Sequence, residues 1–417
     1  MVAHNLDRPL PFKIASPDFH RDPFSRLAEM RAAGPVIPIK FPIVGKLWMT
    51  TTHAATLAVV KDSELFVLEG KNAGKSGTAG LPAWAPKSLK LLTNNMLQKD
   101  EPDHRRLRKL VDQAFARRGI LDMRPGVEKV ADTILDSFEG RDEVDVLNDY
   151  SRHLPIVVIC ELLDLPGKDH ETFSAWARGL SFNGPLSIIR LLGATKKMTV
   201  YLRERISDVR KTPRPGLIGE LVRAEADGDK LSADELVAMV FLLLVAGFET
   251  TTNLISGSIL ELERNPQQKA WLLADPAGRM ERGVEELARC VSAVQGTKPR
   301  LLSRDTEFFG QALKRGELMM AFPAAANGDP AAFGEPDKLK LDRFPNPHLA
   351  FSSGIHFCLG LQLARVETQS ALARLYARFP NLQIVNPGAP DYQMRLGTRA
   401  LKSLQVQLNA RSSAIAA

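Results

Sequence analysis

The sequence predicts a mainly helical fold with small β-sheets, an α+β arrangement, in one domain that covers residues 1–417. Helical spacing of apolar residues, ended by Pro and Gly pairs, predominates at about 100–290 and 348–380. Short extended runs occur instead at about 34–70 and 296–345. The sequence has neither an internal repeat nor an interdomain linker, so we expect both parts to share one compact unit.

The first part of the chain carries the strand signals. Val36–Ile39 and Lys46–Thr52 are rich in apolar and β-branched residues and predict strands of a small sheet. The Gly70–Pro86 segment follows, and Gly70–Ser76 resembles a phosphate-binding loop. That loop requires four residues between its glycines and this one has three, so we expect a solvated, flexible loop.

Composition and charge exclude several classes of protein. The net charge of +7 is a mild excess spread along the chain, which does not indicate nucleic-acid binding. Cys160, Cys290 and Cys358 are too far apart for a disulfide framework, and their small number fits a reducing compartment. The longest apolar run, Leu236–Phe248, has 13 residues, whereas a membrane span needs about 20. The first nine residues contain no apolar segment of signal-peptide type, so we expect no signal peptide. We expect a soluble, cytoplasmic monomer that binds neither nucleic acid nor membrane.

A buried helix with polar residues in its middle is predicted after residue 232. Ser232 and Glu235 form a capping box, and the apolar run that follows indicates a core helix. Glu249 and Thr250 then interrupt the apolar run, close to Gly247. Threonine hydroxyls and glycine both weaken a helix, which predicts a distorted turn. Two interpretations remain open at this point, a functional site and a helix that simply leaves the core at Glu249.

Cys358 lies just before an amphipathic helix signal, in the stretch Phe351-Ser-Ser-Gly-Ile-His-Phe-Cys358-Leu-Gly360. A helix N-terminus stabilises negative charge, so this position suits a thiolate. No other cysteine or histidine stands at the spacing of a zinc site. A single axial thiolate on haem iron fits better. The alternative is an ordinary buried cysteine.

The cysteine stretch resembles the haem-binding signature of the cytochrome P450 family, Phe-x-x-Gly-x-(His/Arg)-x-Cys-x-Gly. The matching residues are Phe351, Gly354, His356, Cys358 and Gly360. Ala246-Gly-Phe-Glu-Thr250 resembles the family motif (Ala/Gly)-Gly-x-(Asp/Glu)-Thr, and Glu286-Leu-Ala-Arg289 resembles Glu-x-x-Arg, with Arg343 at the position of its downstream partner. The resemblance runs from about residue 35 to the C-terminus. It departs locally, for example at Ser352, where glycine is common.

This resemblance implies the cytochrome P450 fold, with haem b buried between the long central helix and the cysteine loop. It implies Cys358 as the axial thiolate, with Ala246 beside the haem. It assigns Glu249 and Thr250 to oxygen activation and proton delivery, and Glu286, Arg289 and Arg343 to a structural network that braces the cysteine loop. Haem propionates need cations, and the residues at the family positions are His104, Arg108, Arg300 and His356.

The resemblance also implies a substrate pocket and a redox partner. Pocket walls are expected from Lys87–Met96, Leu180–Asn183 and Val294–Thr297, and from the central helix. The individual pocket residues are Leu242, Val245, Ala246, Thr250, Val294 and Gly296. Because they are mostly apolar, we expect a hydrophobic substrate. Five basic residues are expected to face solvent, where they either serve solubility or form a docking surface for an acidic ferredoxin: Arg105, Arg106, Lys109, Arg117 and Arg118.

The function implied is a haem-thiolate monooxygenase that oxidises a hydrophobic small molecule with O2 and two electrons from a ferredoxin and its reductase. Two alternatives remain. A peroxide-driven peroxygenase would share the fold, but such family members lack the acid–alcohol pair that Glu249 and Thr250 provide here. A non-catalytic haem or apolar-ligand binder would leave that pair unexplained.

Overall fold

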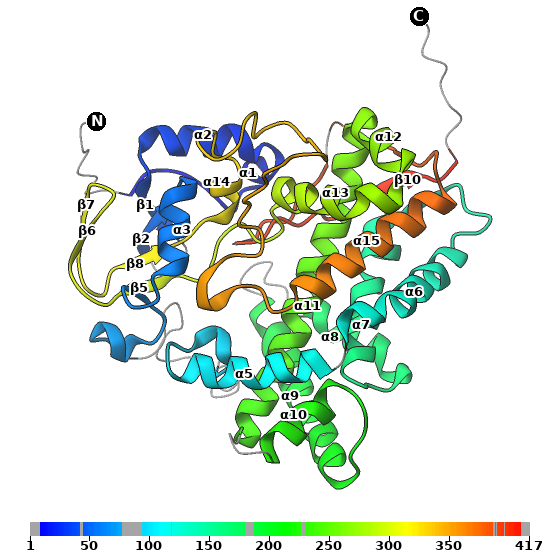
Figure 1. Cartoon of the computed structure of the whole chain (residues 1–417), viewed down its shortest axis with the longest axis horizontal. Helices are drawn as coiled ribbons and strands as arrows, with labels where there is room; N and C mark the ends of the chain where they lie inside the picture. Colours follow the sequence, from blue (N-terminus) through cyan, green and yellow to red (C-terminus); the bar gives the residue numbers. More distant parts are fainter. Residues whose placement is uncertain are drawn as a thin grey trace, which may run out of the picture.

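The computed structural model describes residues 9–41, 45–76, 94–117, 119–179, 187–226, 231–386, 388, 390–395 and 397–409. Figure 1 shows a β-rich part on the left of the view and a larger body of helices on the right, with α11 running through the middle. The mainly helical fold with small sheets is confirmed.

The two segments predicted to be β-rich meet in one five-stranded sheet of order β1-β2-β8-β5-β3. Its strands are β1 (Val36–Phe41), β2 (Gly45–Thr50), β3 (Phe66–Val67), β5 (Arg300–Leu302) and β8 (Leu318–Met320). The N-terminal and later segments join where β2 and β8 pair in parallel, with Trp48 opposite Met319. A helix, α3 (His53–Lys61), interrupts the predicted strand region because the Thr52 side chain caps it by accepting from the Ala55 N–H.

Two smaller sheets and two N-terminal helices lie outside the five-stranded sheet. One sheet has the order β4-β10-β9, and β6 pairs with β7 as a hairpin. The helices α1 and α2 pack on a hydrophobic cluster that includes Met320 and Phe322. The bounds are α1 (Pro17–Arg21), α2 (Pro23–Ala33), β4 (Glu143–Asp145), β6 (Thr306–Phe308), β7 (Gln311–Leu313), β9 (Gln383–Ile384) and β10 (Gln405–Gln407).

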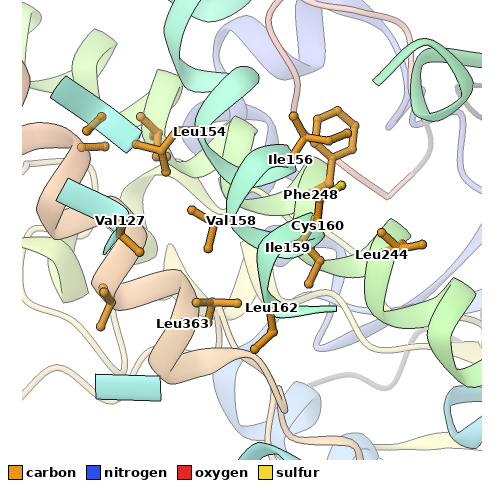
Figure 2. Packing of buried hydrophobic residues seen from close by; sticks show 14 of the residues in the cluster. Val127, Leu154, Ile156, Val158, Ile159, Cys160, Leu162, Leu244, Phe248 and Leu363 are labelled. Atoms are coloured by element: carbon orange, nitrogen blue, oxygen red, sulfur yellow. The ribbon is translucent and has the colours of Figure 1, made fainter. Parts of the chain in front are cut away.

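The remaining helices enclose the main hydrophobic core. Figure 2 shows part of it, where Val158 of α7 lies between Val127 of α6 and Phe248 of α11. Cys160 is buried in this core as expected, and burial raises the pKa of its thiol to about 12. The helices are α5 (Asp103–Arg117), α6 (Arg124–Asp136), α7 (His153–Leu162), α8 (His170–Gly179), α9 (Ser187–Lys211), α10 (Leu217–Ala226), α11 (Ala233–Arg264), α12 (Pro266–Ala274), α13 (Pro276–Val291), α14 (Pro323–Asn327) and α15 (Leu361–Arg378).

The central helix α11 starts at the predicted capping box, in which Ser232 Oγ accepts from the Glu235 N–H and Glu235 accepts from the Ser232 N–H. The predicted distorted turn is absent, and α11 continues unbroken past Thr250. The Thr250 hydroxyl donates to the Ala246 carbonyl at 2.6 Å, and a carbonyl oxygen can accept this bond beside the helical one. By length and composition α11 could cross a membrane, but 61% of its most apolar window is buried inside the protein.

Candidate active site

A cavity of about 390 Å³ lies between α11, the cysteine loop and the segment that leads into β5. Most of the residues predicted for the site line it. From α11 and the β5 segment these are Leu242, Ala246, Thr250, Val294 and Gly296; from the cysteine loop Phe351, His356, Cys358 and Gly360; and from the other expected cation positions His104, Arg108 and Arg300.

The cysteine loop presents the Cys358 thiol to this cavity. The Cys358 N–H donates to the Phe351 carbonyl at 3.0 Å, and the sulfur accepts from the Gly360 N–H, directly before α15 begins at Leu361. Burial raises the pKa of the Cys358 thiol, while the bond from Gly360 and the charge of Arg108 act in the opposite direction. The thiol is therefore placed to become an anionic ligand when a cation binds and displaces its proton.

Two residues of the loop hold it in a left-handed turn. Gly354 has φ +70°, and a Cβ added there would lie 2.3 Å from the Val60 carbonyl oxygen of α3. Gly354 is not among the residues that line the cavity, and glycine at this position lets the loop approach α3 closely. Ser352, at the position where glycine is common, also has positive φ, +62°. A side chain there carries the strain that glycine would avoid.

The residues of this cavity fit a haem group. Gly360 lines the cavity, and a Cβ added there would meet no protein atom within 4 Å, so no packing within the described protein requires glycine at this position. The wall contributed by α11 is apolar at Leu242 and Ala246, as a porphyrin face requires. A thiol, a glycine and several cations around one apolar cavity match the donor set of a haem with two propionates.

The expected cation positions differ in how they are already bound. His104 and His356 contact each other edge to face at 4.4 Å, and Nδ1 of His104 has no hydrogen-bond partner among the described residues. Burial and the neighbouring positive charges lower the pKa of His356 to about 3, so its ring is neutral. Arg108 donates to the Phe357 carbonyl at 2.7 Å and to Asp112 at 3.2 Å. Arg108 thus ties α5 to the cysteine loop, whatever else it binds.

Thr250 and Glu249 face different surroundings. Thr250 lines the cavity, whereas Glu249 does not and instead forms an ion pair with Arg395 from the C-terminal segment. The Arg395 side chain is 11% exposed, and its Nε donates to Gln393 at 2.9 Å. Burial lowers the pKa of Arg395 to about 10. Glu249 is therefore paired with an arginine that is distant in the sequence, which local spacing could not predict.

The three predicted structural residues lie together in a buried network. Arg289 Nε donates to Glu286 at 2.8 Å, and Arg343 Nε lies 3.0 Å from both Glu286 carboxylate oxygens. Glu286 and Arg289 are fully buried. Arg289 and Arg343 both donate to the Lys338 carbonyl, and both guanidinium groups lie over the Phe333 ring. The network thereby fixes the segment that leads into the cysteine loop.

Two further carboxylates were missed by the sequence analysis. The Glu285 carboxylate accepts a hydrogen bond from Arg365 Nε at 2.7 Å and is hydrogen-bonded to His348 Nε2 at 3.1 Å. These bonds join α13, α15 and the start of the cysteine loop. Glu367 of α15 is buried, lines the cavity and binds the Thr251 side chain. Burial raises its pKa well above the ordinary value. An acid on the apolar face of the helix after Cys358 was the signal available for Glu367.

Two side chains lie in other surroundings than predicted. Val245 does not line the main cavity but a second, smaller one beside α7, because one residue along a helix turns the side chain by about 100°. Arg106 was expected to face solvent, yet it donates to Glu235 at 2.5 Å and is 30% exposed. Of the two other pocket segments, residues 87–93 and 180–183 lie outside the described residues, and Met96 lines the cavity.

Comparison with known proteins gives one consistent result. A family model described as Cytochrome P450 matches residues 186–274 and 280–402. The polyketide biosynthesis cytochrome P450 PksS of Bacillus subtilis (strain 168) is 34% identical over 94% of this chain and 97% of that protein. The vitamin D(3) 25-hydroxylase of Pseudonocardia autotrophica is 35% identical over 96% of this chain and 97% of that protein.

Solved structures agree with the sequence comparison. The PksS structure has a TM-score of 0.88 at 33% identity, covering 96% of this chain and 100% of that one. The myxobacterial cytochrome P450 CYP267B1, solved in complex with myristic acid, has a TM-score of 0.86 at 32% identity, covering 95% and 99%. Together with the fold and the cysteine loop, these matches show that the chain belongs to the cytochrome P450 family of monooxygenases.

Proposed function

We propose that this protein binds haem b through the Cys358 thiolate and oxidises a hydrophobic small molecule with O2 and two electrons. The observation that carries the proposal is that Cys358 and Thr250, from two separate elements, line the same largely apolar cavity. When bound, the haem supplies the oxygen-activating chemistry, which a thiolate ligand promotes. The chain supplies position, charge and proton control.

Thr250 and Glu249 are the proposed proton-handling residues. Thr250 Oγ1 already donates to the Ala246 carbonyl, so its lone pairs remain available to accept a hydrogen bond from a group in the cavity. Glu249 sits one residue earlier, outside the cavity and 32% exposed, where it can exchange protons with solvent once Arg395 releases it. Adjacent side chains of a helix do not face each other, so a proton would pass from Glu249 to Thr250 through water.

The cavity supports an apolar substrate. Leu242, Leu243 and Val294 contribute to its walls together with Ala246. The names of the relatives point the same way, since they refer to a polyketide pathway, to vitamin D(3) and to a complex with myristic acid. We infer a substrate of largely hydrocarbon character for this chain as well.

A ferredoxin is the proposed electron donor, and α5 is the proposed docking surface. Arg105 is 81% exposed and Lys109 is exposed on the same helix. Arg108 connects α5 to the Phe357 carbonyl next to Cys358. An acidic partner bound on this helix would therefore lie close to the thiolate. Replacing Arg105 and Lys109 by glutamate should slow reduction by a ferredoxin but not by dithionite.

The decisive experiment is the absorption spectrum of the dithionite-reduced protein with carbon monoxide, for wild type and Cys358→Ser. We expect a strongly red-shifted Soret band in wild type and its loss in the variant. An ordinary haem–CO band in wild type would exclude a thiolate ligand, and a protein without haem would overturn the proposal altogether.

Turnover assays separate the two alternatives. Product formed with hydrogen peroxide alone, at the rate seen with reductant and O2, would identify a peroxygenase. No product and no substrate-dependent oxidation of reduced cofactor would identify a binding protein. The variants Thr250→Ala and Glu249→Gln test the monooxygenase directly, because each should lower the fraction of electrons recovered as product while the CO band is kept.

A further inference from the structure

Lys298 is a cavity residue that none of the sequence motifs includes. It lines the main cavity two residues before Arg300, in the segment that enters β5. Arg300 lines the same cavity. Both positive charges act on His356, which places them at the same end of the cavity. The protein around the cavity lowers the pKa of Lys298 to about 8 and that of Arg300 to about 10. Arg300 is buried, whereas the Lys298 side chain is exposed at the cavity wall, where a bound group would cover it.

The positive charges at this end of the cavity are not balanced by acids of the described residues. Arg108 is paired with Asp112, and His104 lies 3.8 Å from Glu101. Lys298 and Arg300, in contrast, have no acidic side chain within ion-pair distance in the described part of the chain. Within the described residues, the Arg300 side chain donates to the Val59 carbonyl at 3.2 Å.

An unpaired cation in an apolar cavity is unfavourable unless an anion joins it. Two cations that line the same end of one cavity indicate a site for anionic oxygen groups, and the planar guanidinium and the compact ammonium both suit carboxylates. We propose that Lys298 binds a carboxylate at the cationic end of this cavity, either a haem propionate or the acid group of a substrate. The inference rests on the proposed haem-binding function and deepens it.

The test uses the full-length, haem-loaded protein with three variants. Lys298→Met removes the charge at similar length, Lys298→Arg restores it, and Lys40→Met removes an exposed lysine of β1 as the matched control. The first measurement is the rate of haem transfer to excess apomyoglobin. The second is the affinity for tetradecanoic acid and for its methyl ester, read from the shift of the Soret band.

Each source of the carboxylate gives its own result. If Lys298 binds a propionate, Lys298→Met should lose haem about 10-fold faster than wild type, as expected for one lost charge-assisted hydrogen bond, and Lys298→Arg should restore the rate. If Lys298 binds the substrate, Lys298→Met should lower the affinity for tetradecanoic acid by about 10-fold. The affinity for the methyl ester and the haem-transfer rate should stay unchanged. If tetradecanoic acid does not shift the Soret band of wild type, the haem-transfer rate alone tests the inference.

The inference is overturned if Lys298→Met leaves both measurements at wild-type values. It is also overturned if Lys298→Arg is as defective as Lys298→Met, or if Lys40→Met gives the same change. These outcomes are independent of the proposed function, because that is tested by the CO spectrum of wild type. A normal thiolate band with an unaltered Lys298→Met variant would remove the inference and leave the function in place.

Discussion

Replacing Gly354 by alanine should destabilise the protein by an amount that the structure allows us to work out. An alanine at φ near +70° costs about 1–2 kcal/mol more than glycine. Its Cβ would also lie 2.3 Å from the Val60 carbonyl, and the shift that relieves such an overlap costs about 1–3 kcal/mol. The sum is about 2–5 kcal/mol, a large part of a typical unfolding free energy of about 5–15 kcal/mol.

The corresponding change in Tm is small because the chain is long. With about 2.1 cal/mol/K of unfolding entropy per residue, 417 residues give about 0.9 kcal/mol/K and a Tm lowered by about 2–6 °C. The assay is calorimetry of the haem-free and haem-loaded protein. Gly360→Ala is the control, since its Cβ meets no protein atom within 4 Å. That variant should keep the Tm of the haem-free protein and lose haem faster.

An unchanged Tm for Gly354→Ala would refute this reasoning, because it would mean that the loop does not approach α3 as described. Equal losses for Gly354→Ala and Gly360→Ala in the haem-free protein would refute it too. The contrast between these variants separates a glycine required by protein packing from one required by a bound group.

Four further predictions concern ion pairs and strain. Glu286→Gln should cost about 3–5 kcal/mol in urea unfolding, because it leaves the fully buried Arg289 without its partner, whereas Glu335→Gln on the surface should leave the urea midpoint close to that of wild type. Burial alone would raise the pKa of Glu285, but its bonds to His348 and Arg365 lower it to about 2. Its stabilising effect is therefore complete above about pH 5 and lost as the pH falls toward 2, and the difference in urea midpoint between wild type and Glu285→Gln should shrink over that range. Ser352→Gly should raise the unfolding free energy by about 1 kcal/mol, since glycine removes the strain at φ +62°; an equal or lower value contradicts that strain. Arg395→Gln should lower the ratio of product to reduced cofactor consumed, because Glu249 would then be released throughout the cycle and would deliver protons at the wrong stage; Arg395→Lys should recover part of that ratio.

The sequence was most informative where an unusual residue type stands in a fixed local pattern. Cys358 before a helix and Glu249 inside an apolar helix could both be singled out, and the structure places Cys358 and Thr250 at one cavity. Residues that act through distant neighbours could not be found in this way. The pairs Glu249–Arg395 and Glu285–Arg365 join positions 146 and 80 residues apart, and local spacing carries no information about such contacts.

Helix faces were predicted less well than helices. The central helix and its capping box were correct, but assigning Val245 to the main cavity was an error of one position on a helix whose apolar residues surround it on all sides. With apolar residues on every face, periodicity does not indicate which side faces the cavity. Lys298 was missed for a different reason, because a single lysine in an irregular segment looks like any surface lysine until the cavity is seen.

The unbroken apolar helix α11 has a consequence for biosynthesis. α11 ends at Arg264, and α15, which packs against it, begins only at Leu361, about 100 residues later. At a synthesis rate of about 5–20 residues per second, that delay lasts roughly 5–20 s. During this interval the nascent chain presents a long apolar helix that lacks one of its packing partners. We expect chaperones that act at the ribosome to bind the chain in this window, and translation slowed just after residue 264 to increase aggregation.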